Sequence, residues 1–264
     1  MRYRDFFKID KTDGWRDAYE ICNLVVDHYQ QLGLPYNGKY CDIKIVKTRN
    51  CPYYESSSLR ASNGFDERHM IELSIISYNY WCKLMYQLSH ELTHCFIFCN
   101  NQSQAHKASW IEETICEAMS LYYLKLMINK WVRLNLRQRN QNYIKDVRSY
   151  LQDIIDDNDG AIKRNYRLTN CKDMSELLEI DKTSETQRED RKAVMIELYS
   201  HIRKEDVEGL IKYRDFVKIG EKILDTEKYR QAFPGNPAVA YLCDLQDNIL
   251  NRDRREGRTD NTVA

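Results

Sequence analysis

Apolar residues recur along most of this 264-residue chain with the spacing of amphipathic helices. Residues 13–32, residues 80–98 and the stretch that starts near Ser109 carry apolar side chains at i, i+3 and i+4, which predicts three long helices. Residues 42–47 alternate apolar with polar side chains, and residues 70–76 are mainly apolar, so both favour β-strands. A strand is therefore expected directly before the helix at 80–98.

The C-terminal half shows helical patterns separated by polar breaks. Candidate helices there cover residues 141–156, 173–180, 186–203, 205–224 and 237–251, with a loop expected at residues 156–160. In the N-terminal half, residues 50–64 are expected to form a loop or a hairpin. Nine Gly and four Pro in the whole chain are too few for the many tight turns of an all-β protein. The expected fold class is α+β and mainly helical.

Charge and cysteine usage narrow the classes of function. Forty basic and forty acidic residues cancel, so no global field favours nucleic acid or an anionic membrane as partner. No stretch approaches the roughly 20 apolar residues of a membrane-spanning helix, and no conventional export signal is visible, which indicates a cytoplasmic protein. The nine cysteines include no tandem CxxC pair, which fits a reducing compartment. Those with apolar helical neighbours are expected to be buried free thiols: Cys82, Cys95, Cys99 and Cys116.

The helix predicted at residues 80–98 carries the motif His90-Glu91-Leu92-Thr93-His94. Histidines four apart on a helix share one face, so both can present a ring nitrogen to one zinc ion, with Glu91 beside the attacking water. Two imidazoles are an incomplete catalytic site, because such sites usually have three protein ligands.

The third ligand has to come from further along the chain. The residues directly after His94 lack the Gly-containing His or Asp pattern of metzincins, which excludes that class. The first acidic residues downstream are Glu112 and Glu113 on the next predicted helix. Eighteen residues separate Glu113 from His94, and Glu112 is the second choice.

The spacing HExxH, eighteen residues, then Glu resembles the metal signature of gluzincin peptidases of the aminopeptidase N-like family. Residues 110–113, Trp-Ile-Glu-Glu, are similar to that family's Trp-Leu-Asn-Glu, and Glu117 occupies the acidic position that thermolysin-like gluzincins keep four residues after the glutamate ligand. The resemblance covers roughly residues 70–125. It implies a zincin-like fold, one Zn²⁺ per chain held by His90, His94 and Glu113, and Glu91 as general base. Glu117 would orient one histidine by accepting its other ring N–H.

The chain also departs from this family. Aminopeptidase N-like enzymes carry a Gly-x-Met-Glu-Asn stretch that binds the substrate's free amino terminus, and no such stretch is present. An internal peptide bond is therefore favoured as the cleavage site. Gluzincins further use a Tyr or His to stabilise the oxyanion, and no candidate can be singled out. The candidates in the C-terminal region are Tyr166, Tyr199, His201 and Tyr213.

These observations predict a zincin-like catalytic core at residues 1–130, with a small mixed β-sheet and the HExxH helix. A helical region at 131–251 and a disordered tail at 252–264 follow it. The expected activity is zinc-dependent hydrolysis of a peptide or protein substrate, with the oligomeric state left open. The alternative is a non-catalytic zinc-binding scaffold that acts through protein partners. The strand at 70–76 is either a substrate-pairing edge of the sheet or a core strand.

Overall fold

A computed structural model provides the coordinates of the chain. It describes residues 2–37, 39–46, 53–56, 69–101, 107–162, 167–184 and 188–259. The chain forms two compact units: residues 1–100 with 119–154 are unit 1, and residues 101–118 with 155–264 are unit 2. Each unit combines two separate segments, so the expected boundary at residue 130 does not coincide with this division.

Unit 1 contains a four-stranded mixed sheet in the order β1-β2-β4-β3. Its strands are β1 (Phe7–Ile9), β2 (Cys41–Ile45), β3 (Tyr53–Ser56) and β4 (His69–Leu73). Strands β1, β2 and β4 are parallel, and β3 runs antiparallel to β4. The expected mainly helical α+β class with a small mixed sheet is confirmed, although β1 was not predicted because its three residues are too few for an alternation to be recognised.

Strand β4 differs from the expectation in its length and in its place in the sheet. It ends at Leu73, and Ile76 is 75% exposed, because residues 74–80 turn away from the sheet towards the next helix. It also pairs with β2 on one side and with β3 on the other. Its backbone donors and acceptors are therefore used within the sheet, so the core-strand alternative is right for this strand and the substrate-pairing edge is wrong.

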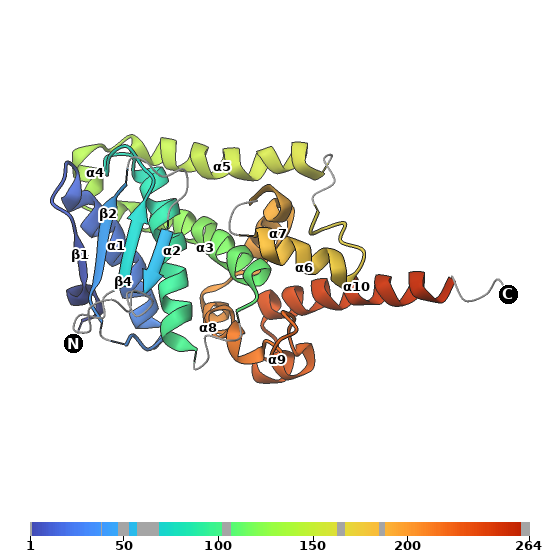
Figure 1. Ribbon diagram of the computed structural model, residues 1–264. Helices are drawn as coiled ribbons and strands as arrows, with labels where there is room; N and C mark the ends of the chain where they lie inside the picture. Colours follow the sequence, from blue (N-terminus) through green and yellow to red (C-terminus); the bar gives the residue numbers. More distant parts are fainter. Residues whose placement is uncertain are drawn as a thin grey trace. The chain divides into compact units, whose positions relative to one another are not determined.

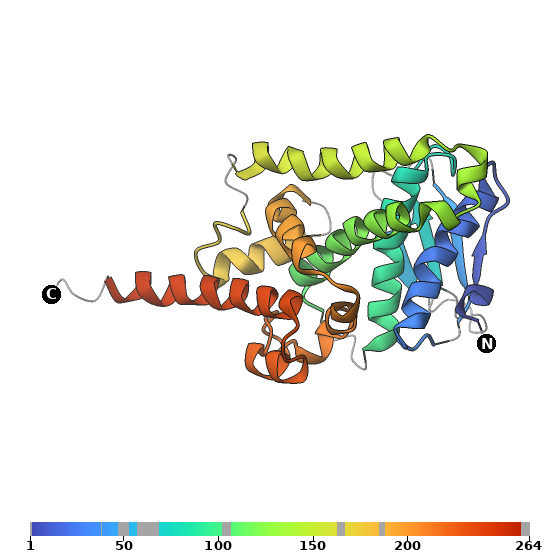
Figure 2. The ribbon, with the colours of Figure 1, turned by 180° about the vertical axis from the view of Figure 1, so that it is seen from behind.

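The helices of unit 1 begin with α1 (Trp15–Gln31) and α2 (Trp81–Asn100), close to the predicted ranges. Helix α1 stops before Gly33, whose φ of +72° is a backbone conformation that favours glycine. Both helices lie on the same face of the sheet and contact each other, which is visible in Figure 1 and from behind in Figure 2. Unit 1 also includes η1 (Tyr3–Phe6), η4 (Trp131–Arg133), α4 (Leu136–Arg139) and the parts of α3 (Ser109–Lys130) and α5 (Tyr143–Ile162) that fall within it.

A buried hydroxyl contact joins α1 to α2. Tyr29, fully buried on α1, stacks on Phe96 with ring centroids 4.2 Å apart, and its hydroxyl lies 2.9 Å from the hydroxyl of Thr93. Thr93 donates to the carbonyl of Ser89 one turn earlier, so it can accept the proton of Tyr29. The contact fixes α2 against α1 at the level of the motif.

Unit 2 is helical. Its elements are the first part of α3, the end of α5, α6 (Met174–Thr183), η5 (Arg188–Arg191), α7 (Lys192–His201), η6 (Lys204–Asp206), α8 (Val207–Ile211), η7 (Tyr213–Phe216), α9 (Thr226–Ala232) and α10 (Pro237–Thr259). Within the described residues, no helix combines the length and apolar content needed to cross a membrane.

Three expectations for unit 2 need correction. The predicted single helix at 205–224 is broken into α8 and η7, followed by a β-bridge between Val217 and Leu224 around Gly220 with its positive φ. The predicted loop at 156–160 is helical, because α5 continues through it; each poor helix former costs at most about 1 kcal/mol once the helix is established. Helix α10 continues to Thr259 instead of ending at 251, and residues 260–264 lie outside the described residues.

The contact between Tyr29 and Thr93 predicts a measurable loss of stability. Tyr29→Phe removes the hydroxyl and keeps the ring, so the free energy of unfolding should fall by about 0.5–1.5 kcal/mol in urea denaturation. A double-mutant cycle with Thr93→Val should show coupling between the two residues. Tyr19→Phe, on the same helix but 36% exposed, is the control and should leave stability unchanged. Equal effects at Tyr19 and Tyr29 would contradict the prediction.

Candidate metal centre

The HExxH motif lies in the middle of α2, which is buried almost all round. Every residue from 88 to 97 is buried. Two hydroxyls on this stretch bond back to the helix itself: Ser89 Oγ donates to the carbonyl of Met85 at 2.6 Å, and Thr93 Oγ1 donates to that of Ser89 at 2.7 Å. These bonds satisfy polar side chains that would otherwise be costly to bury, so the helix can carry a polar motif within an apolar core.

His90 and His94 point their ring nitrogens at the same place. Their Nε2 atoms are 3.2 Å apart, and the rings meet at 70° with centroids 4.9 Å apart. Two nitrogens that bind one tetrahedral metal at its usual bond lengths lie about 3.3 Å from each other. The observed separation therefore suits a shared metal ion, and it also suits an N–H···N hydrogen bond between neutral rings. The predicted pair of ligands on α2 is thus brought together.

Glu91 is also buried on α2, with 3% of its surface exposed, beside His90 in the chain. A buried carboxylate is costly unless a partner or a functional role compensates for it. Glu91 interacts with other groups of the protein, so its buried carboxylate is not left without a partner.

Glu113 and Glu117 lie one helical turn apart on the part of α3 that belongs to unit 2. They are 8% and 5% exposed, which is unusual for glutamate. Residues four apart on a helix share a face, so the two carboxylates project on the same side of α3. A merely solvent-facing role is therefore excluded for both residues.

Glu112, the second choice as ligand, is committed to another contact. Its carboxylate receives two hydrogen bonds from the Arg214 guanidinium, at 2.7 and 2.8 Å, and one from the Tyr213 hydroxyl. All three side chains are at least 95% buried. Burial acts to lower the pKa of Arg214, but the Glu112 carboxylate more than offsets this and raises it, so the pair is ionic. Glu112 is therefore a structural anchor in unit 2.

Further contacts fix the first turn of α3. The backbone N–H of Trp110 donates to Asp181 at 3.0 Å, which satisfies one of the free donors at the start of the helix, and the indole N–H donates to the carbonyl of Lys222 at 3.1 Å. Together with the Glu112–Arg214 pair, they hold the segment that presents Glu113. Asp181 and Arg214 were not identified from the sequence, because each lies at least 70 residues away from its partner.

The four oxyanion candidates differ in their surroundings. Tyr213 is fully buried and donates to Glu112, and burial followed by the Glu112 charge raises its pKa, so it is a structural partner of Glu112. His201 lies 3.5 Å from Glu197 and stacks on Tyr241. Tyr199 is half-buried on α7, and burial raises its pKa. Tyr166 lies outside the described residues.

Comparisons with family models, curated proteins and solved structures find no match to this chain.

The buried ion pair of unit 2 predicts a large loss of stability on removal of its cation. Arg214→Met leaves the Glu112 carboxylate buried without its counter-charge, so the free energy of unfolding should fall by about 3–5 kcal/mol at neutral pH. Arg230→Met is the matched control, because Arg230 forms exposed ion pairs with Asp244 and Asp247 and its loss should cost less than about 1 kcal/mol. Denaturant unfolding of both variants tests the difference, and similar losses would refute the assignment of Glu112 as an anchor.

Proposed function

We propose that this chain is a zinc-dependent peptidase of the gluzincin type, with a zincin-like fold. The observation that carries the proposal is the 3.2 Å separation of the Nε2 atoms of His90 and His94 within a buried HExxH helix. Buried imidazoles that converge in this way, with a buried carboxylate next to them in the chain, suit a metal centre better than a packed core.

The third ligand in this proposal is Glu113. Glu112 is occupied by Arg214 and Tyr213, which leaves Glu113 as the acidic residue at the eighteen-residue spacing. In this proposal Glu113 completes the donor set of His90 and His94 that the eighteen-residue spacing predicts. Two neutral imidazoles and one carboxylate suit Zn²⁺ and leave the centre with a net positive charge. Glu117 would fix the tautomer of one histidine, because it shares the face of Glu113 on α3.

In the proposed reaction, Glu91 is the general base. Zinc, when bound, polarises the scissile carbonyl and makes water a stronger acid. Glu91 accepts a proton from the attacking water and then passes it to the leaving amine, so one carboxylate serves both steps. His90 and His94 keep their Nε2 lone pairs available for the metal, which requires the neutral tautomer with the proton on Nδ1.

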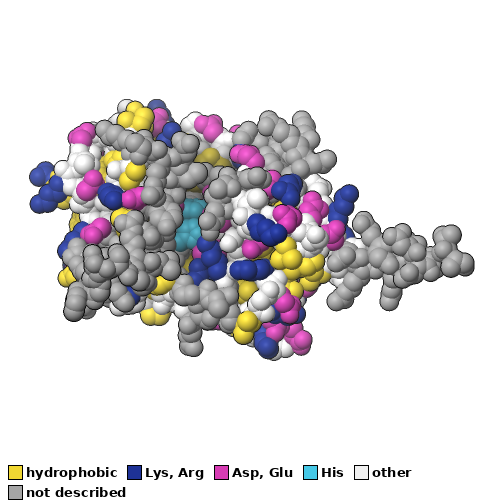
Figure 3. Space-filling model, in the orientation of Figure 1, with side chains coloured by type: hydrophobic (Ala, Val, Ile, Leu, Met, Phe, Trp, Pro, Cys, Tyr) yellow, Lys and Arg dark blue, Asp and Glu magenta, His cyan; other side chains and the backbone are white. Residues whose placement is uncertain are grey.

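A peptide substrate agrees with further features of the chain. Described basic and acidic side chains are intermingled on the face shown in Figure 3, which does not favour a polyanion such as nucleic acid. Helix α2 contacts both β3 and β4, and among the described strands β3 pairs on one side only. An extended peptide can therefore add to β3, the sheet edge beside the motif helix. Cleavage of internal bonds remains the preferred reaction, because the chain lacks the Gly-x-Met-Glu-Asn stretch.

The role of Glu91 is tested by Glu91→Gln. This change keeps the size of the side chain but removes the base, so the zinc content should stay at the wild-type level. The rate of cleavage of a peptide mixture should fall by at least about 100-fold, because general base catalysis typically contributes about 10²–10⁴-fold. Metal analysis and mass spectrometry of the digest, with and without a chelator, measure both effects. A zinc-loaded wild type that cleaves nothing would support the non-catalytic scaffold instead, and full activity of Glu91→Gln would rule out the mechanism.

The choice between the two adjacent glutamates is tested by a crossed pair of variants. Glu113→Gln should weaken zinc binding by more than about 100-fold, because losing a residue that only hydrogen-bonds to a metal ligand already costs about 10–100-fold. The stability of the protein should change little. Glu112→Gln should lower stability through Arg214 and keep zinc bound at temperatures where the variant is folded. Zinc titration against a competing chelator and thermal unfolding measure the two properties. The reverse pattern would assign the ligand to Glu112.

A further inference from the structure

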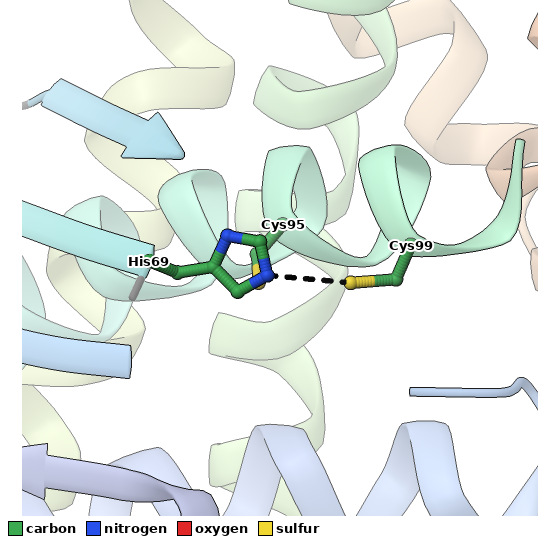
Figure 4. A group of neighbouring side chains, drawn as sticks. All are labelled: His69, Cys95 and Cys99. Carbon is green, nitrogen blue, oxygen red and sulfur yellow. Dashed lines mark hydrogen bonds between the residues drawn. The ribbon is translucent and has the colours of Figure 1, made fainter. Parts of the chain in front are cut away.

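A second group of side chains that could hold a metal ion lies on another face of α2 from His90 and His94. His69, the first residue of β4, meets Cys95 and Cys99 of α2, as Figure 4 shows. Each of the three residues offers one ligand atom, and these three atoms all lie within 4.8 Å of one another. Cys99 Sγ is 3.9 Å from His69 Nε2. All three side chains belong to unit 1.

The spacing in this cluster is close to that of a zinc site. Sulfur and nitrogen ligands of one tetrahedral zinc ion lie about 3.6 Å apart, which follows from Zn–S and Zn–N bonds of about 2.3 and 2.0–2.1 Å. The 3.9 Å separation of Cys99 and His69 therefore requires only a small inward movement. Cys95 and Cys99 are four residues apart, so they share a face of α2 in the same way as the two motif histidines.

A fourth donor approaches from the neighbouring strand. Cys41 of β2 is the register partner of His69, so the two side chains project from the same face of the sheet, and Cys41 is fully buried. Phe98 packs edge-on against the His69 ring, with centroids 5.4 Å apart, which limits how the ring can turn. Three thiols and one imidazole are the donor set of a closed, structural zinc site.

The His69 ring also has a partner that a metal ion would replace. The amide nitrogen of Asn37 lies 3.0 Å from His69 Nε2. In the tautomer with its proton on Nδ1, Nε2 accepts this hydrogen bond with the lone pair that binds a metal. Asn37 is exposed on a loop, so it can move aside, whereas His69 and Cys95 are fully buried and Cys99 is half-buried.

We propose that His69, Cys95 and Cys99, with Cys41 as the fourth ligand, bind a structural Zn²⁺ ion that joins the sheet of unit 1 to α2. Binding exchanges the thiol protons for the metal, so protons are released and no oxidant is needed. The site is separate from the proposed catalytic centre, and each can exist without the other. The chain would then hold two zinc ions instead of the one expected from its HExxH motif.

Cobalt titration of the full-length protein tests this site. Thiolate bound to Co²⁺ absorbs in the near ultraviolet by charge transfer, whereas a centre of two histidines and a glutamate has no sulfur and gives no such band. The wild type, stripped of metal and titrated with Co²⁺ alone under reducing conditions, should develop the band and bind two ions. The double variant His90→Ala and His94→Ala should keep the band and bind one.

Cys99→Ser is the main variant, because Cys99 is the least buried ligand and the change conserves size. It should lose most of the band and one of the two ions, and keep the Glu91-dependent peptidase activity if the proposed function holds. Cys82→Ser, on the same helix near Tyr143, is the matched control and should titrate as the wild type does. Circular dichroism confirms that each variant is folded.

The absence of a sulfur band in the folded wild type would overturn the proposal. An unchanged band in Cys99→Ser would overturn it as well, and His69→Gln supplies an independent check on the same readout. A failure of the proposed peptidase function gives a different result, because the band would be present while peptide cleavage is absent.

Discussion

The burial of α2 is the constraint on which the rest of the structure depends. A helix that is buried almost all round needs partners for most of its polar groups, because an unpaired amide or hydroxyl in an apolar environment costs several kcal/mol. Helix α2 does this in three ways: hydroxyls bond back to the preceding turn, Thr93 also bonds Tyr29 of α1, and His90 and His94 face each other. What remains polar on this helix is therefore placed with little freedom, which a metal centre requires.

In unit 2, buried charged groups also have hydrogen-bonding partners. The Glu112 carboxylate has a guanidinium and a phenol as partners, and the start of α3 has the Asp181 carboxylate for one of its free N–H groups. Because Glu112 is neutralised, its neighbour Glu113 is the buried acidic group for which a ligand role is proposed. An adjacent pair of glutamates thus divides into a structural residue and a candidate ligand, although both have the same side chain.

The sequence predicted the parts of the fold that depend on local patterns. Helices α1, α2 and α3 and strand β2 begin and end close to the predicted positions, because apolar periodicity and Gly33 are local signals. The segment 205–224 was misjudged because its apolar residues recur at helical spacing, while the turn around Gly220 and the bridge from Val217 to Leu224 depend on tertiary packing. The neighbours of β4 depend on pairings across the whole sheet, so its interior position could not be read from residues 70–76.

The candidate site shows the same limit. The spacing of four between His90 and His94 is a property of one helix and was predictable, whereas the pairing of Glu112 with Arg214 joins residues about 100 positions apart. The cluster of His69, Cys95 and Cys99 was overlooked for a related reason. The two cysteines were interpreted as buried hydrophobes, and His69 has no motif around it. The signal that was present is the spacing itself, since Cys95 and Cys99 repeat the i, i+4 arrangement of the motif histidines.

The geometry of α2 explains how one helix can carry two such pairs without conflict. At 3.6 residues per turn, the midpoint of Cys95 and Cys99 lies roughly 140° round the helix from the midpoint of His90 and His94. The cysteine pair lies beside His69 of β4, whose register partner on the adjacent strand is Cys41. The histidine pair lies on another face of α2. A metal beside His69 would restrain α2 without occupying the face that carries His90 and His94. The histidines keep a support of their own, because Thr93 between them bonds the hydroxyl of Tyr29 on α1, so the two pairs can act independently.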